Sequence, residues 1–150
     1  MIHKSVISMS LSGGQSDALN AAVNAAYLAG LPVFVAAGNN GADAGSYSPG
    51  SAQYAITVGA TDSTDTRASW SNYGPSLTIF APGVGILSVW NSCNTCRMVE
   101  SGTSMATPHV AGMGAYLIAK EGIQNPATLA QRLTYLSIGA IVKNAGTGST

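Results

Sequence analysis

The sequence predicts an α/β fold in which helices flank a mostly parallel sheet, and three observations lead to this prediction. Near the start, a strand, a helix and a second strand follow one another within about 35 residues, the size of a right-handed unit with parallel strands. Both strands end in glycine-rich loops. Further along, residues 103–120 are nearly all apolar or small, which predicts a helix buried on most sides.

The first unit can be justified residue by residue. Residues 4–11 alternate polar and apolar side chains, which predicts a strand. Ser16 is suited to cap the following helix, with Asp17 in its first turn, and Gly30 is suited to end it. The apolar run 32–37 then predicts a buried strand.

The remaining elements follow in order. We expect strands over 54–60, 78–80 and 85–89, with loop-like segments at 45–53 and 62–76. After the long helix, Asn125 can cap a last helix over 126–137, because Pro126 suits its first position. Residues 138–150 are expected to form a trailing loop.

The composition excludes several classes of protein. The chain has 150 residues, of which 46% are hydrophobic and 8% charged, with six basic and six acidic side chains. A disordered chain would carry more charge, and a nucleic-acid protein that works through bulk charge would be basic. The longest apolar run, 110–119, is too short to cross a bilayer. We therefore expect one domain, with no nucleic acid and no membrane as partner, and no signal peptide in this chain.

The two parallel strands of the first unit also predict where a ligand binds. Ligands of open α/β sheets bind at the carboxyl ends of the strands. The loops 10–14 and 36–41 follow such ends. We therefore expect them to face one shared cleft.

The cysteines, Cys93 and Cys96, leave three alternatives open. They stand in a turn-like run with C-x-x-C spacing, which favours a small loop disulfide over free thiols. Metal or redox chemistry is the third alternative. A zinc site would need two more ligands, and the histidines are His3 and His109.

The most informative segment is 101–112, in which a serine stands at the mouth of the long helix. Pro108 has no N–H, so the carbonyl of Ser104 lacks its ordinary helical hydrogen bond. Gly102 permits close approach by another backbone, and a helix N-terminus suits a developing oxyanion. Composition alone favours an N-cap serine on a core helix.

The amino-acid sequence of this segment also resembles a known motif. Residues 102–112 read G-T-S-M-A-T-P-H-V-A-G and resemble, at every position, the nucleophile motif of the subtilisin-like serine proteases, the subtilases of peptidase family S8. Residues 8–14 and 35–39 resemble two further segments of that family, and the chain is most similar to the proteinase K branch with its secreted fungal members. The resemblance implies a three-layer sandwich around a mostly parallel sheet.

The resemblance also implies roles for individual residues. It makes Ser104 the acylating nucleophile and Asn39 the side-chain donor to the oxyanion, together with the backbone N–H of Ser104. It places substrate on two walls, whose small side chains leave room for a sizeable apolar group. These walls are Ser10, Leu11 and Ser12 on one side and Ala36, Ala37 and Gly38 on the other.

A base and an orienting carboxylate are also needed for this chemistry. In the family motif the histidine at position 109 is structural, and His3 matches no catalytic motif. The family carries its triad Asp and His in upstream segments, and no aspartate of this chain stands in a matching context. We therefore expect residues 1–150 to be the C-terminal portion of a subtilase catalytic domain, without the triad Asp and His and short of the family's final strand.

The resemblance implies that the function is serine-type endopeptidase activity through an acyl-enzyme, with this portion inactive alone. The alternatives are a peptide-binding product that does not cleave, and a non-functional truncated product. The expected partners are a polypeptide substrate and the missing N-terminal half of the domain, and the expected location is extracellular. No cofactor is expected; the family suggests calcium, but Thr78 stands where proteinase K has a ligating aspartate.

Overall fold

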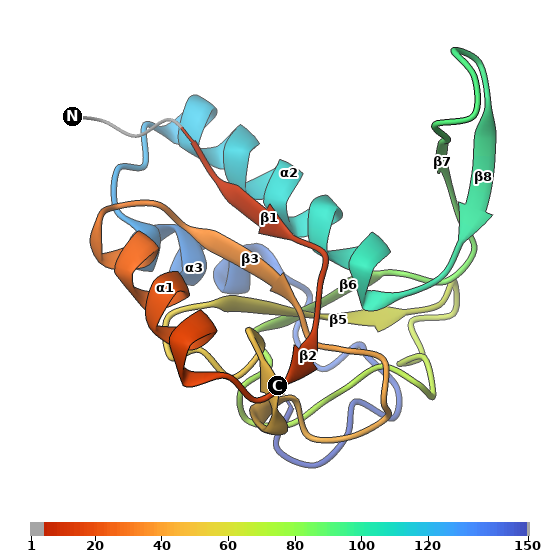
Figure 1. Ribbon diagram of the computed structural model, residues 1–150, viewed down its shortest axis with the longest axis horizontal. Coiled ribbons are helices and arrows are strands. Elements are labelled where there is room, and N and C mark those ends of the chain that lie inside the picture. Colours follow the sequence, from red (N-terminus) through yellow and green to blue (C-terminus); the bar gives the residue numbers. More distant parts are fainter. Residues whose placement is uncertain (1–4, 150) are drawn as a thin grey trace.

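The computed structural model describes residues 5–149 and is built on a four-stranded parallel sheet (Figure 1). The strands lie in the order β1 (Ile7–Met9), β3 (Val33–Ala36), β5 (Ile56–Thr61) and β6 (Ile79–Pro82). His3 and Lys4, the latter the first residue of the first predicted strand, lie outside the described residues. The predicted α/β class with a mostly parallel sheet is confirmed.

The helix α1 (Asp17–Leu28) connects β1 to β3 and forms with them the predicted parallel unit. The side chain of Ser16 caps it by accepting a hydrogen bond from the N–H of Leu19, and Asp17 lies in the first turn. Tyr27 of this helix stacks on Tyr54, with 4.6 Å between the ring centres. The helix and β3 therefore follow the sequence pattern closely, whereas β1 is shorter than the strand predicted over 4–11, because Ser10 and Leu11 already belong to the loop that follows it.

The two faces of β3 pack against different layers. Val33 and Val35 join Val23 of α1 in one cluster of buried side chains. Phe34 points to the other face and packs with residues of α2 (Thr103–Glu121) and α3 (Pro126–Leu136). The alternation along one strand thus places the sheet between α1 and the pair α2 and α3, which makes three layers.

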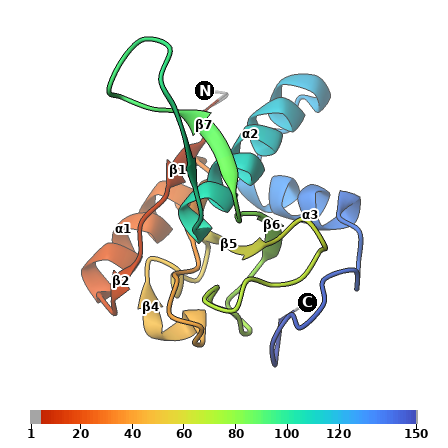
Figure 2. The same ribbon diagram turned by 90° about the vertical axis from the view of Figure 1, so that its right-hand side faces the viewer.

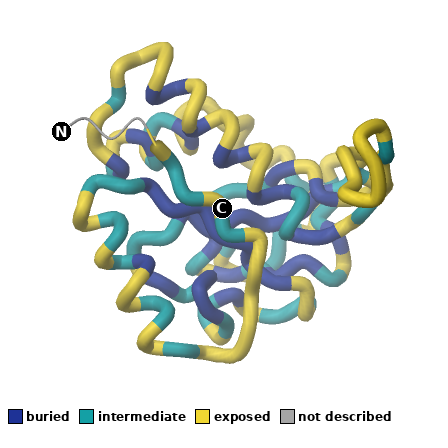
Figure 3. Tube along the Cα trace, turned by 45° about the horizontal axis from the view of Figure 1, so that its top comes forward, coloured by how far each residue is buried: buried dark blue, intermediate teal, exposed yellow. Residues whose placement is uncertain are grey.

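The helix α2 is buried along one side, and the expectation that most of it is buried was wrong. Ala106, Val110 and Gly114 are among its buried residues, whereas Met113 and Tyr116 are about half exposed. Buried and exposed stretches alternate along the helix (Figure 3). A helix on one face of a sheet buries one stripe, and small apolar residues on its outer side do not change that. Gly122 ends α2 in the left-handed conformation, and Asn125 caps α3 as predicted.

Short elements lie in regions that were predicted to be loops. The strand β2 (Gly13–Gly14) pairs antiparallel with β4 (Tyr47–Ser48), and the 3-10 helix η1 (Ala44–Ser46) precedes β4. These segments fix the loop after β1 against the loop after β3. Residues 138–149 form no helix or strand, as predicted, and are held by Lys143, whose backbone N–H donates to the carbonyl of Asp65.

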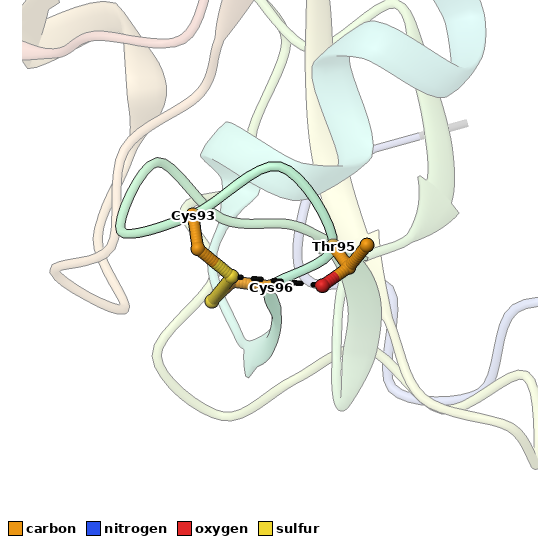
Figure 4. The surroundings of a disulfide bond; sticks show 3 residues. All are labelled: Cys93, Thr95 and Cys96. Carbon is orange, nitrogen blue, oxygen red and sulfur yellow. Dashed lines mark hydrogen bonds between the residues drawn. A yellow bond between two sulfur atoms is a disulfide. The ribbon is translucent and has the colours of Figure 1, made fainter.

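A two-stranded hairpin projects from the body of the molecule (Figure 2). It consists of β7 (Ile86–Val89) and β8 (Arg97–Glu100), which pair antiparallel. Cys93 and Cys96 form a disulfide at its tip (Figure 4). The small loop disulfide that the C-x-x-C spacing favoured is therefore present in the structure.

Within residues 5–149, no helix combines the length and the apolar character that crossing a membrane requires.

Candidate active site

A groove of about 350 Å³ opens where β1, β3 and α2 meet. Met9 pairs with Val35, and Ala36 pairs with Val58, so the residues that follow β1 and β3 leave the sheet at one edge. This is the shared cleft that the topology predicts. Its lining comes from three separate segments of the chain, and the residues are Ser10, Leu11, Ser12, Ala36, Asn39, Asn40, Thr103 and Ser104.

Ser104 lies in the first turn of α2 and makes two reciprocal hydrogen bonds with Ser10. Its hydroxyl donates to the carbonyl oxygen of Ser10 at 3.1 Å. The Ser10 hydroxyl donates in turn to the carbonyl oxygen of Ser104 at 2.7 Å. The second bond fills the vacancy that Pro108 leaves, because Pro108 cannot donate to that carbonyl. Ser104 is half-buried and lies at the groove, so it is not packed in the interior.

The side chain of Asn39 is held in one orientation by Thr103. Its Oδ1 accepts from the backbone N–H of Thr103 at 2.9 Å and from the Thr103 hydroxyl at 2.8 Å. Two donors on one atom identify that atom as the oxygen, so the amide nitrogen is the end free to donate elsewhere. Asn39 is exposed and lines the groove, whereas Thr103 is fully buried.

Four of the six residues predicted to form the substrate walls line the groove. Ser10, Leu11, Ser12 and Ala36 line the groove. Ala37 and Gly38 are buried behind it rather than among its lining residues. Sequence reasoning missed two lining residues, Asn40 and Thr103, although both adjoin residues that it named.

His109 does not contact Ser104 through a hydrogen bond. Its Nδ1 donates to the carbonyl oxygen of Met105 at 2.8 Å, because a carbonyl can only accept. The side chain is exposed, so its hydrogen bond, and not burial in the core, keeps it in place. This agrees with a structural role for His109.

No aspartate of the described residues reaches the groove lining. Asp43 precedes Ala44 and Gly45 and so has the letters D-x-G, but its carboxylate accepts from the N–H of Gly45 at 2.8 Å and caps η1. The groove therefore brings together a serine hydroxyl and a carboxamide, and residues 5–149 add neither an imidazole nor a carboxylate to its lining.

Thr78 is hydrogen-bonded to Thr57 of β5 through its side chain and its backbone. Its hydroxyl oxygen accepts from the N–H of Thr57 at 3.1 Å, and its own N–H donates to the Thr57 carbonyl. The described residues contain no group of three or more His, Cys, Asp or Glu side chains that could hold a metal ion. A hard cation binds preferentially where carboxylates gather. The side chains of the described residues therefore gather no carboxylate cluster for calcium near Thr78.

Comparison with known proteins places this geometry in a family. The model of the subtilase family, Peptidase_S8, matches residues 2–146. Subtilisin-like protease 2 of Pseudogymnoascus destructans is 55% identical over 141 residues, which are 94% of this chain and 35% of that protein. Extracellular serine proteinase of Thermus sp. is 50% identical over 145 residues, 97% of this chain and 35% of that protein.

Solved structures agree. A cold adapted subtilisin-like serine proteinase superposes with a TM-score of 0.91 at 43% identity, over 98% of this chain and 53% of that one. The chain spans about a third of the length of the curated relatives it matches. The match in sequence covers nearly the whole chain, and the match in structure includes the sheet and the helix that form the groove. The chain therefore belongs to the subtilase family of serine proteases.

Proposed function

We propose that the groove is the nucleophile and oxyanion half of a serine endopeptidase centre, in a chain that forms the C-terminal portion of a catalytic domain. One observation carries the proposal: Ser104 and Asn39, 65 residues apart, line one groove, and Thr103 turns the Asn39 amide so that its nitrogen can donate. A hydroxyl beside a fixed donor is the arrangement that acyl transfer requires.

In the proposed reaction, Ser104 Oγ attacks the scissile carbonyl carbon of a polypeptide. A bond forms between Oγ and that carbon, the hydroxyl proton passes to a base, and the carbonyl oxygen becomes an oxyanion. The Asn39 amide nitrogen and the Ser104 N–H donate to it. The oxyanion then collapses, the carbon–nitrogen bond breaks, and the protonated base gives its proton to the departing amine. Water next attacks the acyl carbon and gives a proton to the base, and the carbon–Oγ bond breaks as that proton returns to Ser104.

The base has to come from outside the described residues. The Ser104 hydroxyl donates to the carbonyl of Ser10, which cannot take up a proton, and His109 is bonded to Met105. We therefore propose that the imidazole and its orienting carboxylate come from an N-terminal segment of the domain, which would also be a binding partner of this chain.

The substrate proposal follows from the walls of the groove. Ser10, Leu11 and Ser12 follow the edge strand β1 and can pair with an extended peptide backbone. Ala36, with Ala37 and Gly38 behind it, leaves room for a sizeable apolar side chain. Because the Thermus sp. relative is named an extracellular proteinase, we propose that this polypeptide substrate is met outside the cell.

The first experiment measures hydrolysis of a peptide ester by the purified 150-residue chain. We expect no turnover above background, since residues 5–149 place no imidazole or carboxylate in the groove lining beside Ser104. The chain is then mixed with a separately produced N-terminal segment of the catalytic domain, taken from the Pseudogymnoascus destructans relative and chosen to carry the family's triad Asp and His. We expect turnover to appear with the native chain and to be absent with Ser104→Ala. Turnover by the mixture that survives Ser104→Ala would overturn the assignment of the nucleophile.

A second candidate function is peptide binding without cleavage. The observation that favours it is the hydrogen bond from the Ser104 hydroxyl to the Ser10 carbonyl. The groove is formed, but the hydroxyl donates to an atom that cannot act as a base. Titration of the chain with a labelled peptide tests this. Absence of saturable binding up to millimolar concentration removes it.

A further inference from the structure

We propose that Asn72 is a positioning residue for Asn39, the donor that the proposed function assigns to the oxyanion. Asn72 lies outside the groove lining and makes no hydrogen bond to Ser104 or to the side chain of Asn39. It acts through the backbone of the loop 37–42, which carries Asn39. This inference rests on the proposed function.

Asn72 holds both ends of that loop. Its Nδ2 donates to the carbonyl of Ala37 at 2.9 Å, and its backbone N–H donates to the carbonyl of Gly38 at 2.9 Å. Its Oδ1 accepts from the N–H of Asn40 at 2.9 Å and of Ala42 at 3.1 Å. Four bonds from one residue therefore fix the backbone on each side of Asn39.

The site is built for a carboxamide. Asn72 is fully buried, and each polar atom of its side chain has a partner. A carboxylate there would set a charged oxygen against the Ala37 carbonyl, and an aliphatic side chain would leave the N–H groups of Asn40 and Ala42 without their acceptor. An amide supplies the donor and the acceptor that the loop needs.

Asn72 is itself anchored to the sheet. Its neighbour Ser71 accepts from the N–H of Ala60 in β5 at 3.0 Å and donates to the carbonyl of Asn72 at 3.1 Å. Gly38 is adapted to the close contact, since it has φ +103° and a Cβ there would lie 2.5 Å from Asn72 Nδ2. The central sheet thus sets the position of Asn39 through Ser71 and Asn72, while Thr103 sets the orientation of its amide.

The test measures how much better the chain binds a transition-state mimic than the plain peptide. The probes are a peptide boronic acid and the same peptide as its amide, titrated into the 150-residue chain at alkaline pH. Ser104 Oγ gives an electron pair to the empty orbital of boron, its proton passes to the buffer, and the resulting tetrahedral anion places an oxygen where the oxyanion would form. The ratio of the two dissociation constants reports the oxyanion donors.

We expect Asn72→Leu to reduce this ratio by about 10- to 100-fold, because the Asn39 amide would be displaced from the position at which it donates to the oxyanion. The affinity for the plain peptide should stay nearly unchanged. Asn72→Asp keeps the acceptor for Asn40 and Ala42 and should reduce the ratio less. Leu129→Ala, which removes a buried side chain of α3, is the control for general destabilisation and should leave the ratio unchanged.

The outcomes separate the two proposals. If the native chain does not prefer the boronic acid, the proposed function fails and this inference fails with it. If the native chain prefers it and both Asn72 variants keep the full ratio, Asn72 does not position Asn39. If Asn72→Leu does not fold, Asn72→Asp carries the test, together with amide hydrogen exchange, which should quicken at Gly38 and Asn39 in that variant and not in Leu129→Ala.

Discussion

Pro108 shows how a single residue shapes the surroundings of Ser104. Because proline has no N–H, the Ser104 carbonyl is left without a helical partner, and the sequence alone predicts that vacancy. The structure fills it with the hydroxyl of Ser10, which belongs to the loop after β1. The same residue pair bonds in the other direction, so the start of α2 is tied to the end of β1 by two hydrogen bonds.

Loss of the Ser10 hydroxyl should therefore loosen that tie. We expect Ser10→Ala to lower the free energy of unfolding by about 0.5–1.5 kcal/mol, the usual net contribution of one hydrogen bond. Ser8→Ala, at an exposed position of β1 two residues earlier, is the matched control and should change it by less than about 0.5 kcal/mol. Urea unfolding measures both. Equal effects of the two changes would show that the bond from Ser10 contributes nothing to stability.

Asp62 should make stability depend on pH in the acidic range. Three hydrogen bonds hold the pKa of this carboxyl group below its ordinary value of 3.8. In order of effect, the donors are the N–H of Thr64, the hydroxyl of Thr64 and the N–H of Thr66. Because the pKa is lower in the folded state, the stabilisation is present above pH 3.8 and is lost as the pH falls through the folded value. Urea midpoints below pH 3.8 should fall less steeply for Asp62→Asn than for the native chain. Parallel curves would contradict this.

Ser104 and Asn39, the proposed nucleophile and oxyanion donor, stand out in single segments of the sequence, but the residues that support them do not. Ser104 and Asn39 stand in runs whose letters resemble a family. Asn72 is separated from Ala37 by 35 positions, and Thr103 from Asn39 by 64. A buried polar side chain can be recognised only through its partners, and the fold decides which distant backbone atoms become those partners.

At the scale of elements, the pattern of apolar residues predicted position and type well. The helices α1 and α3 agree with their predicted capping residues because capping is a local interaction. The short pair β2 and β4 was missed because its four residues carry no periodicity, and their pairing depends on loops brought together by the sheet. The one-sided burial of α2 was missed for a related reason, since glycine and alanine fit either a buried or an exposed face.

Two glycines of α2 offer a test of how this helix packs. A Cβ on Gly114 would lie 2.5 Å from Cζ of the fully buried Phe34. We expect Gly114→Ala to be destabilising, because overpacking costs about 1–3 kcal/mol and exceeds or cancels the helix-propensity gain of about 1 kcal/mol. Thermal and urea unfolding of the purified chain measure the change.

Gly112 is the matched control, two residues earlier on the same helix. It is exposed, and a Cβ there would meet no atom within 4 Å. Gly112→Ala should therefore gain only the propensity term and raise the free energy of unfolding by about 0.5–1 kcal/mol. If both substitutions stabilise the chain to the same extent, Phe34 is not held against Gly114 as tightly as the structure indicates.

At the scale of the whole molecule, the hairpin of β7 and β8 stands apart from the three layers (Figures 1 and 2). Leu87 lies opposite Val99, and Val89 lies opposite Arg97, so these three apolar side chains share one face of the hairpin. All three are more than half exposed, and Val89 is 83% exposed. A hairpin with such a face is a ready contact for another copy of the chain.

We therefore expect the chain to self-associate as its concentration rises, and Val89→Glu to weaken that association. The carboxylate would stand opposite Arg97, so the cross-strand pair stays favourable while the apolar face is interrupted. Leu28→Glu is the control, since Leu28 is 72% exposed and ends α1, a helix on the opposite side of the molecule from the hairpin (Figure 1). Sedimentation velocity over a concentration series measures the effect. If Leu28→Glu weakens association as much as Val89→Glu does, added charge is responsible and the hairpin face is not the contact.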